Sequence, residues 1–478
     1  MWTSASRKLL AFVAGLSLME GVWAVPIEPR ENQKKCRKTT VVVLGGGMAG
    51  ITAAQALANQ SITDFLIVEY NGEIGGRMKH TNFGKKKDGS PFVVELGANW
   101  VQGLGTKGGP ENPIWTMAKK YKVANEYSNY SSILTLIDDY ETAYAEVEQY
   151  AGVILKENLQ DTSMRAGLAL KDFKPQKNMA AQARGFNALA KGMASTFLKP
   201  NDSRLLLNSI VTDIAYDKDS VTISLNDGSC ISAAYAICTF SLGVLQNDEV
   251  SFTPKLPDWK QTAIAEFQMG TYTKVFLQFN ETFWDLDTQF FLYASPTTRG
   301  YYPVWQSLST AGFLPGSNII FATVVERESY RIEAQDDEVT KAEALAVLRE
   351  MFPDKHIPEP IDFFYPRWTK VPWAHGSYSN WPVGTTLEGH QNLRSNVGRL
   401  YFAGEHCSAE YFGFLQGAYF EGQEAGMRIA GMLGKKCKNM EGGCGEYKRY
   451  EALHGTTRFA EFSPLNGWDV SSFYVAGK

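Results

Sequence analysis

The stretch "TTVVVLGGGMAGITAAQALANQ", Thr39 to Gln60, decides the fold class of this chain. Its β-branched run Val41–Val43 is typical of a buried strand, and "MAGITAAQALA" is typical of a helix. Between the two, Gly45, Gly47 and Gly50 form the pattern G-x-G-x-x-G. The first glycine permits a tight turn, the second lets the backbone approach a pyrophosphate, and the third lets helix and strand pack closely. The stretch therefore predicts a dinucleotide-binding turn in an α/β fold.

A second strand, "DFLIVEY", supports this interpretation because an acid stands at its end. Glu69 follows Gly50 by 19 residues. A carboxylate at that place can accept both hydroxyls of an adenosine ribose, and it disfavours a 2′-phosphate. The complete strand–turn–helix–strand unit favours a nucleotide site over a structural turn beside a surface glutamate.

Two further segments favour FAD over NAD. "EYNGEIGGRMKH" places Gly76 and Arg77 shortly after Glu69, and guanidinium geometry suits pyrophosphate or flavin oxygens. Far along the chain, "YFAGEHCSAEYFGFLQGAYFEG" again predicts strand, turn and helix, with Gly404 and Glu405 at the end of the strand. The N-terminal dipole of that second helix would point at a bound cofactor. The expected ligand is therefore FAD, a longer dinucleotide that these two further segments would also contact.

The middle of the chain alternates between helical and strand patterns. The segment 127–200 is helical in character, "YETAYAEVEQYAGVILKENL" above all. A run of strands follows, with Asn226–Gly228 as a hairpin turn. "DDEVTKAEALAVLREMF" predicts an acidic helix. The cofactor domain is therefore expected to be discontinuous, with substrate-domain pieces inserted.

Taken together, these motifs resemble the flavin amine oxidase family, and the secreted polyamine oxidases of plants and fungi most closely. The matching segments run in order from about residue 39 to 435 and are "VVVLGGGMAGITAAQAL", "LIVEYNGEIGGRM", "VELGANWVQG", "SLGVLQ", "TYTKVFLQF", "SYSNWPVG" and "YFAGEHCSAEYFGFLQGAY".

The resemblance implies an α/β fold with an α+β substrate part: a discontinuous, glutathione-reductase-like Rossmann-type domain that binds FAD. It implies hydride transfer from an amine carbon to flavin N5, hydrolysis of the imine, and reduction of O2 to H2O2. The implied FAD-binding segments are 39–125, 201–250 and 376–435, the substrate-binding segments are 126–200 and 251–375, and 436–478 is a tail.

The resemblance also assigns roles by position. Lys274 would hold a water against flavin N5, although a solvated edge lysine is the alternative reading of its strand. Tyr378 and Phe414 would form two aromatic walls around the substrate amine, where ring faces favour or desolvate a cation. Trp100 and Trp381 are expected to line the same region. The implied FAD-binding residues are Gly45, Gly47, Gly50, Glu69, Gly76, Arg77, Val211, Gly404 and Glu405.

The chain departs from the family in two places. Gln102 stands where the plant enzymes have a tunnel glutamate, so the charge attraction to a second ammonium is absent. The segment between Ala151 and Asn201 is shorter than usual, with Glu126, Asp138 and Asp139 as candidate replacement acids. Oxidation of a polyamine or acetylpolyamine is expected. The alternatives are a bulkier amine of secondary metabolism, or an inactive flavoprotein.

The N-terminus predicts secretion. Residues 1–24 have the pattern of a signal peptide: Arg7 and Lys8 precede the apolar run "LLAFVAGLSLM", which is too short to span a bilayer comfortably. Sequons at four asparagines fit a glycoprotein, and no later stretch predicts a membrane span. The sequon residues are Asn59, Asn129, Asn201 and Asn280. A monomer is expected.

The charge balance argues against nucleic acid as a partner, and the motifs argue against metal and serine-nucleophile chemistry. Lys plus Arg total 47 and Asp plus Glu total 51, so no basic excess exists to bind nucleic acid. The six histidines show no zinc-type spacing, so no metal is expected, and no G-x-S-x-G motif occurs.

The six cysteines are compatible with disulfides. Cys36, Cys437 and Cys444 lie in polar segments and are the expected bridge partners, in a pairing left open. Cys230 and Cys238 border strand-like runs and are expected to be buried thiols.

"EGGC", which ends at Cys444, is similar to the attachment motif of covalent monoamine oxidases. In that family the motif precedes the last flavin-binding turn, whereas here it follows Gly404 and Glu405, so a disulfide or a terminal thiol is expected at Cys444 and non-covalent FAD is predicted.

Overall fold

The computed structural model describes most of the chain from Cys36 onward. The predicted signal peptide, the predicted helix within 127–200, the candidate acids Asp138 and Asp139, and Cys437 and Cys444 lie outside the described residues. The described ranges are 36–105, 109–129, 131–135, 177–180, 184–383, 385–434 and 450–454.

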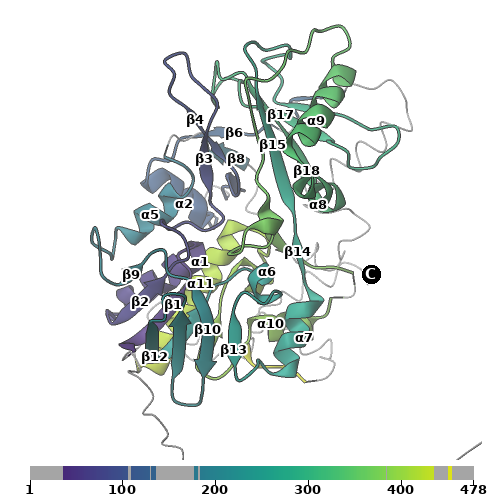
Figure 1. Ribbon diagram of the computed structural model, residues 1–478. Helices are drawn as coiled ribbons and strands as arrows, with labels where there is room; N and C mark the ends of the chain where they lie inside the picture. The colour runs from purple at the N-terminus through teal and green to yellow at the C-terminus, as the bar shows by residue number, and fades with distance from the viewer. Residues whose placement is uncertain are drawn as a thin grey trace, which may run out of the picture. The chain divides into compact units, whose positions relative to one another are not determined.

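An eight-stranded mixed sheet carries the predicted dinucleotide turn (Figure 1). The strand order is β13-β10-β11-β12-β1-β2-β9, with β21 also pairing with β12. The fully buried residues Val41–Leu44 belong to β1, which runs parallel to both β2 and β12, as the continuous apolar run predicts. The strands are β1 (Arg37–Leu44), β2 (Phe65–Val68), β9 (Leu205–Leu206), β10 (Val211–Tyr216), β11 (Val221–Leu225), β12 (Cys230–Cys238), β13 (Ser251–Thr253) and β21 (Leu400–Phe402).

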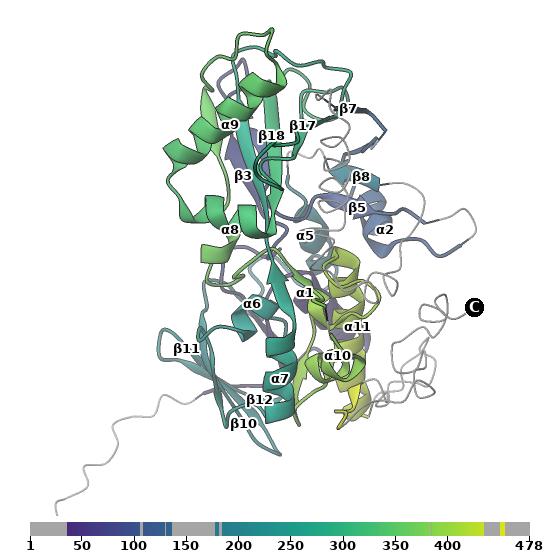
Figure 2. The same cartoon turned by 90° about the vertical axis from the view of Figure 1, so that its right-hand side faces the viewer.

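Two helices lie side by side against this sheet, although they are far apart in the sequence (Figures 1 and 2). They are α1 (Met48–Asn59) and α11 (Leu415–Met432), the two helices predicted to follow the cofactor turns. Gly422 allows their close approach, because a Cβ there would lie 2.1 Å from the carbonyl oxygen of Ala49. Because β1 and β21 both run parallel to β12, the turns that follow these two strands lie at the same end of the sheet.

A second large sheet has six strands, in the order β19-β15-β18-β17-β16-β7. The helices α8 (Glu326–Ala334) and α9 (Asp337–Met351) accompany it, and α9 confirms the predicted acidic helix (Figure 2). Its strands are β7 (Ile133–Thr135), β15 (Tyr272–Gln278), β16 (Phe290–Leu292), β17 (Val304–Ser307), β18 (Ile319–Val325) and β19 (Asp362–Phe364).

Smaller elements connect the two large sheets. The strand pairs are β3 (His80–Phe83) with β4 (Phe92–Glu95), and β14 (Gln268–Gly270) with β20 (Tyr378–Asn380); β8 (Lys177–Ala180) pairs with β5 (Trp100–Gln102) and β6 (Asn125–Tyr127). The remaining helices are α2 (Pro113–Lys120), α5 (Ala188–Ala194), α6 (Leu242–Leu245), α7 (Asp258–Glu266), α10 (Leu387–Arg394), η1 (Trp368–Lys370) and η2 (Glu405–Cys407). Among the described residues, no helix has the length and apolar character needed to cross a membrane.

The structure moves one predicted domain boundary. The sequence predicts that residues 251–375 belong to the substrate-binding segments, yet β13 (Ser251–Thr253) pairs with β10 of the eight-stranded sheet. Leu256, Ile264 and Phe267 then pack in the same hydrophobic core as that sheet. The hairpin turn at Asn226–Gly228 is confirmed, because β11 ends before it and β12 begins after it.

The structure also corrects the expectation for Cys230. It forms a disulfide with Cys36, with the two Cα atoms 4.6 Å apart. Arg37 pairs with Ile231 in the parallel ladder of β1 and β12, and this register brings the two cysteines together. That register cannot be read from spacing along the chain. Cys36 is a bridge partner as predicted, and Cys238 is a buried thiol as predicted.

Candidate functional site

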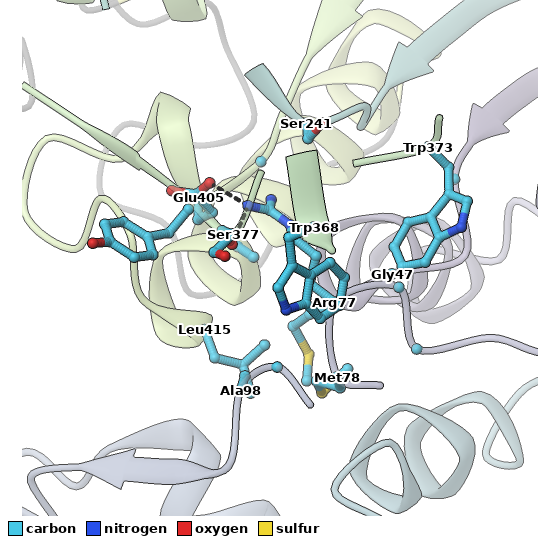
Figure 3. Close-up of a pocket in the computed structure, with 18 of the residues that line it drawn as sticks. Gly47, Arg77, Met78, Ala98, Ser241, Trp368, Trp373, Ser377, Glu405 and Leu415 are labelled. Atoms are coloured by element: carbon cyan, nitrogen blue, oxygen red, sulfur yellow. Dashed lines mark hydrogen bonds and ion pairs between the residues drawn. The ribbon is translucent and has the colours of Figure 1, made fainter. Parts of the chain in front are cut away.

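One cavity gathers most of the predicted site residues, from segments far apart in the chain. Figure 3 shows part of its lining, with Gly47, Arg77 and Glu405 among the labelled residues. Gly50, Lys274 and Trp381 do not line it. The predicted residues that line it are Gly45, Gly47, Glu69, Gly76, Arg77, Trp100, Gln102, Val211, Tyr378, Gly404, Glu405 and Phe414.

At one end of the cavity Glu69 holds the glycine turn in place. Its Oε2 accepts a hydrogen bond of 2.6 Å from the amide of Gly46, and its Oε1 accepts bonds of 2.8 Å from the backbone and side-chain amides of Asn71. Val211, at the start of β10, lines the same end. The carboxylate is buried and aligned along the turn, as a ribose-binding acid requires.

The glycines of the turn have two different roles: one allows close packing of helix on strand, and another leaves space beside the backbone. A Cβ at Gly50 would lie 1.9 Å from the carbonyl oxygen of Gly45, so glycine is required for α1 to pack on β1. A Cβ at Gly47 would meet nothing closer than the Cα of Gly76, at 4.0 Å. Gly47 and Gly76 thus present bare backbone to the cavity from two sides. This bare backbone at the N-terminus of α1, called the cradle below, has the chemistry that binds a diphosphate.

Arg77 and Glu405 join the two cofactor turns. The Arg77 Nη1 donates to Glu405 Oε1 at 2.8 Å and to the carbonyl oxygen of Ser377 at 3.0 Å (Figure 3). The other carboxylate oxygen accepts hydrogen bonds from the Ser379 hydroxyl and from the amide of Gly413 at 2.7 Å. Arg77 was predicted to contact the cofactor, and the structure shows that it also links both turns.

The environment of Glu405 keeps it ionised. Burial by itself raises the pKa of this carboxyl, but the Arg77 guanidinium, His406 and the Ser379 hydroxyl together lower it to about 2. A buried carboxylate held in this way fixes the position of Arg77 beside the cradle.

The pH dependence of stability tests this arrangement. A depressed pKa contributes stability above the unfolded-state value near 4.5, and that contribution is lost as pH falls toward 2. Glu405→Gln is therefore expected to lose roughly 2–3 kcal/mol of stability at pH 6, and much less at pH 3. Urea unfolding at both pH values measures this, with Glu338→Gln on the exposed face of α9 as control. An equal loss at both pH values would contradict the assignment.

Lys274 lies behind the cavity wall rather than on its surface. It is 1% exposed, and its Nζ donates to the carbonyl oxygens of Glu95 at 3.0 Å and Gly97 at 2.8 Å, and to Asn99 Oδ1 at 3.0 Å. The Nζ also lies 4.9 Å from the centroid of the Trp100 ring. Lys274 is thus no solvated edge lysine, and it fixes the segment that forms one wall of the cavity. Its contact with a water remains a prediction.

The aromatic lining of the cavity is larger than the sequence indicated. Tyr378, on β20, and Phe414, at the start of α11, both line it, as does Trp100. Sequence reasoning missed Trp368 and Trp373, whose ring centroids are 5.8 Å apart with planes at 89°. The run "RWTKVPW" before the predicted Tyr378 is the signal that could have indicated them.

Trp381 and Glu126 lie away from this cavity. The Trp381 ring stacks on Phe412 at 4.9 Å and meets Phe267 edge-on, inside the core of the eight-stranded sheet. The expectation that Trp381 lines the substrate region is therefore not met. Glu126, on β6, lies beside Gly312 and does not line the cavity. Its proposed replacement of a tunnel acid has no support in this geometry.

Gln102 does line the cavity, two residues after Trp100 on β5. Among the described residues, its buried Oε1 has no hydrogen-bond partner. The lining acids are Glu69, Glu249 and Glu405, and each already has a partner in the turns or in His375. The part of the cavity around Gln102 therefore offers an amide and no free carboxylate from the described chain.

Comparison with known proteins agrees with this geometry. The family model described as flavin containing amine oxidoreductase matches residues 48–149 and 134–430. The chain belongs to the flavin-containing amine oxidoreductase family. It is an FAD-dependent amine oxidase, and the cradle at Gly47 and Gly76 is where this amine oxidase would hold the diphosphate of its cofactor.

Several relatives are similar over most of their length. Polyamine oxidase 1 of Zea mays is 36% identical, over 92% of this chain and 98% of that protein. Polyamine oxidase 7 of Oryza sativa subsp. japonica is 34% identical, over 80% and 93%. The alignment with the maize protein spans 513 positions against 478 residues here, so some positions of that relative have no counterpart in this amine oxidase.

A solved structure confirms the α/β fold of this amine oxidase. A putrescine oxidase variant, reported in a redesign of cofactor binding, superposes with a TM-score of 0.62 at 15% identity. The match covers 83% of this chain and 100% of that one.

Proposed function

We propose that this amine oxidase oxidises a polyamine or, preferentially, an N-acetylated polyamine. The observation that carries the proposal is the aromatic cavity itself: Trp100, Tyr378 and Phe414 line the same space as the dinucleotide cradle. Relatives named polyamine oxidases, at 33–36% identity, support the substrate class.

The cofactor, the aromatic residues and Lys274 have different roles in this proposed reaction. When bound, FAD would supply the acceptor for the hydride of the carbon next to nitrogen, with O2 as the final electron acceptor. The aromatic faces attract a protonated amine and also desolvate it, which favours the neutral form that can be oxidised. Lys274 keeps the wall between Glu95 and Trp100 rigid.

The amide of Gln102 favours the acetylated substrate. A free polyamine presents a second ammonium, and no unpaired carboxylate among the described lining residues would receive it. An acetamide needs hydrogen-bond partners instead of a countercharge, and the unpartnered Gln102 Oε1 can accept from an amide N–H.

Gln102→Glu is therefore expected to reverse the preference. The introduced carboxylate should raise kcat/KM for spermine relative to N1-acetylspermine by about tenfold, because a partly screened charge pair contributes near 1.4 kcal/mol. Steady-state peroxide formation with both substrates measures the ratio. Gln102→Met, which removes the hydrogen bond without adding charge, serves as control and should weaken only the acetylated substrate. An unchanged ratio in Gln102→Glu would exclude this residue from substrate selection.

The bulkier amine of secondary metabolism is the second candidate, and the inactive flavoprotein is the third. A panel of polyamines, acetylpolyamines and bulky amines, assayed by peroxide release with product identification, separates them. Turnover of an acetylpolyamine supports the proposal. Turnover of a bulky amine alone supports the second candidate, and a flavin-loaded protein without turnover supports the third.

A secreted, glycosylated monomer is also part of the proposal. The disulfide between Cys36 and Cys230 suits an oxidising compartment. Three sequon asparagines, Asn59, Asn201 and Asn280, are exposed, and Asn129 is half-buried, so the glycans would not disturb the core. Expression with the native N-terminus, analysis of the medium, glycosidase treatment and light scattering test secretion, glycosylation and mass.

FAD is proposed to be bound without a covalent link. The nearest cysteine in the sequence to the second cofactor turn, Cys407, is fully buried, and burial raises the pKa of its thiol well above the usual range. A protonated, buried thiol is a poor nucleophile. Acid precipitation is expected to leave the yellow flavin in the supernatant. Flavin that remains in the pellet would show that the link is covalent.

A further inference from the structure

The carboxylate of Glu333, on α8, is fully buried and does not line the cavity. Its Oε1 accepts hydrogen bonds from the hydroxyl of Thr273 and, at 3.4 Å, from the hydroxyl of Ser329. Its Oε2 accepts from the backbone amide of Thr369 at 2.8 Å and from the Thr369 hydroxyl at 2.6 Å. Both oxygens are thus satisfied inside the protein, and a buried carboxylate bonded in this way keeps its donors in fixed positions.

Two of these donors stand next to residues that form or support the cavity wall. Thr273 precedes Lys274 on β15, and Thr369 follows Trp368 in η1. Trp368 lines the cavity, and Lys274 lies behind its wall. Glu333 therefore connects the strand that carries the buried lysine to the 3-10 helix that carries a wall tryptophan.

Lys274 and Trp368 also meet on the other side, at one short backbone segment. The Lys274 Nζ donates to the carbonyl oxygen of Gly97 at 2.8 Å, and the Trp368 Nε1 donates to the carbonyl oxygen of Leu96 at 3.4 Å. Leu96 and Gly97 both line the cavity. The contacts form a closed ring, in which Glu333 joins the two segments from behind. A displacement at Glu333 is therefore passed to both sides of the wall.

We propose that Glu333 is a positioning residue of this amine oxidase, which holds Trp368 and the Lys274 strand at a fixed separation and so sets the shape of the cavity. Trp368 and Arg77 line the same cavity, so this shape extends to the cofactor turns (Figure 3). The inference concerns the oxidation of an amine by FAD and depends on no particular amine.

Two substitutions at Glu333 separate the bridge from the charge. The backbone amide of Thr369 can only donate, so the side-chain oxygen of Glu333→Gln would face Thr369. Its NH2 group would then donate to the hydroxyls of Thr273 and Ser329, which can also accept. Glu333→Gln is therefore expected to keep the bridge, whereas Glu333→Ala removes it.

The first test is the limiting rate of anaerobic flavin reduction in the holoenzyme, counted per bound FAD so that unfolded protein does not contribute. With the amine that the wild type oxidises fastest, Glu333→Ala should be slower by about tenfold and Glu333→Gln by no more than about twofold. Glu343→Ala is the matched control, because it breaks an ion pair with Arg331 on the same helix α8. It should lower the melting temperature but keep the rate. A wild-type rate in Glu333→Ala, or an equal loss in Glu343→Ala, would overturn the proposal.

A second variant guards against misfolding of Glu333→Ala. Thr369→Val deletes one hydroxyl, keeps the backbone amide and should slow flavin reduction by about threefold. In the Glu333→Ala background the same change should have no further effect, because its acceptor is already absent. Thr340→Val, which removes a buried hydroxyl bonded to Tyr365, should leave the rate unchanged. An equal loss from Thr369→Val with and without Glu333 would refute the bridge.

The position of Trp368 can also be followed without any substrate. In the holoenzyme labelled with 5-fluorotryptophan, the ¹⁹F resonance of Trp368 is assigned with Trp368→Phe. This resonance should shift or broaden in Glu333→Ala and stay in place in Glu333→Gln and Glu343→Ala. A resonance that does not change in Glu333→Ala would contradict the proposal. Because this readout needs no turnover, its outcome is independent of whether the protein oxidises a polyamine.

Discussion

Lys274→Met is expected to lower kcat by about a hundredfold or more while the protein keeps its FAD. Methionine preserves the apolar stem, so the variant should fold. It leaves the oxygens of Glu95, Gly97 and Asn99 without their donor, and the wall that carries Trp100 loses its anchor. The Gly47 and Gly76 cradle does not touch Lys274, so cofactor content should stay near that of the wild type.

Stopped-flow absorbance of the flavin, under anaerobic conditions and after mixing with O2, separates the reductive and the oxidative half-reactions. At least one of them should be slow in Lys274→Met. Lys255→Met, at an exposed position, serves as control for a lost lysine and should behave as wild type. Wild-type rates in both half-reactions would show that Lys274 does not contribute to catalysis.

Gly47→Val is expected to abolish FAD binding, with at least a hundredfold loss of affinity, while the apoprotein remains folded. Apart from its chain neighbours, a Cβ at this position would meet no protein atom closer than the Gly76 Cα, at 4.0 Å, so a valine side chain would extend into the cradle itself. The backbone amides at the start of α1 could then no longer approach a diphosphate.

Gly50→Ala is the matched comparison. Its Cβ would lie 1.9 Å from the Gly45 carbonyl oxygen, so the helix and strand must move apart and stability should fall by several kcal/mol. Flavin content by absorbance and apoprotein melting temperature distinguish the two variants. A Gly47→Val protein that retains one FAD per chain would show that the cradle lies elsewhere.

Much of the cofactor site could be predicted from the sequence because its signals are local. The turn at Gly45–Gly50 and Glu69 lie within one β–α–β unit, where spacing fixes geometry. Arg77 and Glu405 could be named only because each follows its own glycine-rich turn, and their mutual ion pair required the structure.

The remaining features depend on contacts between distant segments. The disulfide of Cys36 with Cys230 follows from the register of β1 against β12. Trp381 belongs to the core because it stacks on Phe412, a contact that no periodicity indicates. The hydrogen bond from Lys274 Nζ to the backbone carbonyl of Glu95 likewise joins two strands of different sheets.

The most direct test is anaerobic bleaching of the flavin in the purified protein. The visible spectrum would be recorded before and after addition of spermine, spermidine, N1-acetylspermine and a set of monoamines, and again after air is admitted. Bleaching by the acetylated polyamine first, followed by recovery of the yellow colour with one H2O2 per reduced flavin, is the predicted result. A yellow protein that none of these amines bleaches would contradict polyamine oxidation, and a colourless protein would contradict the FAD site itself.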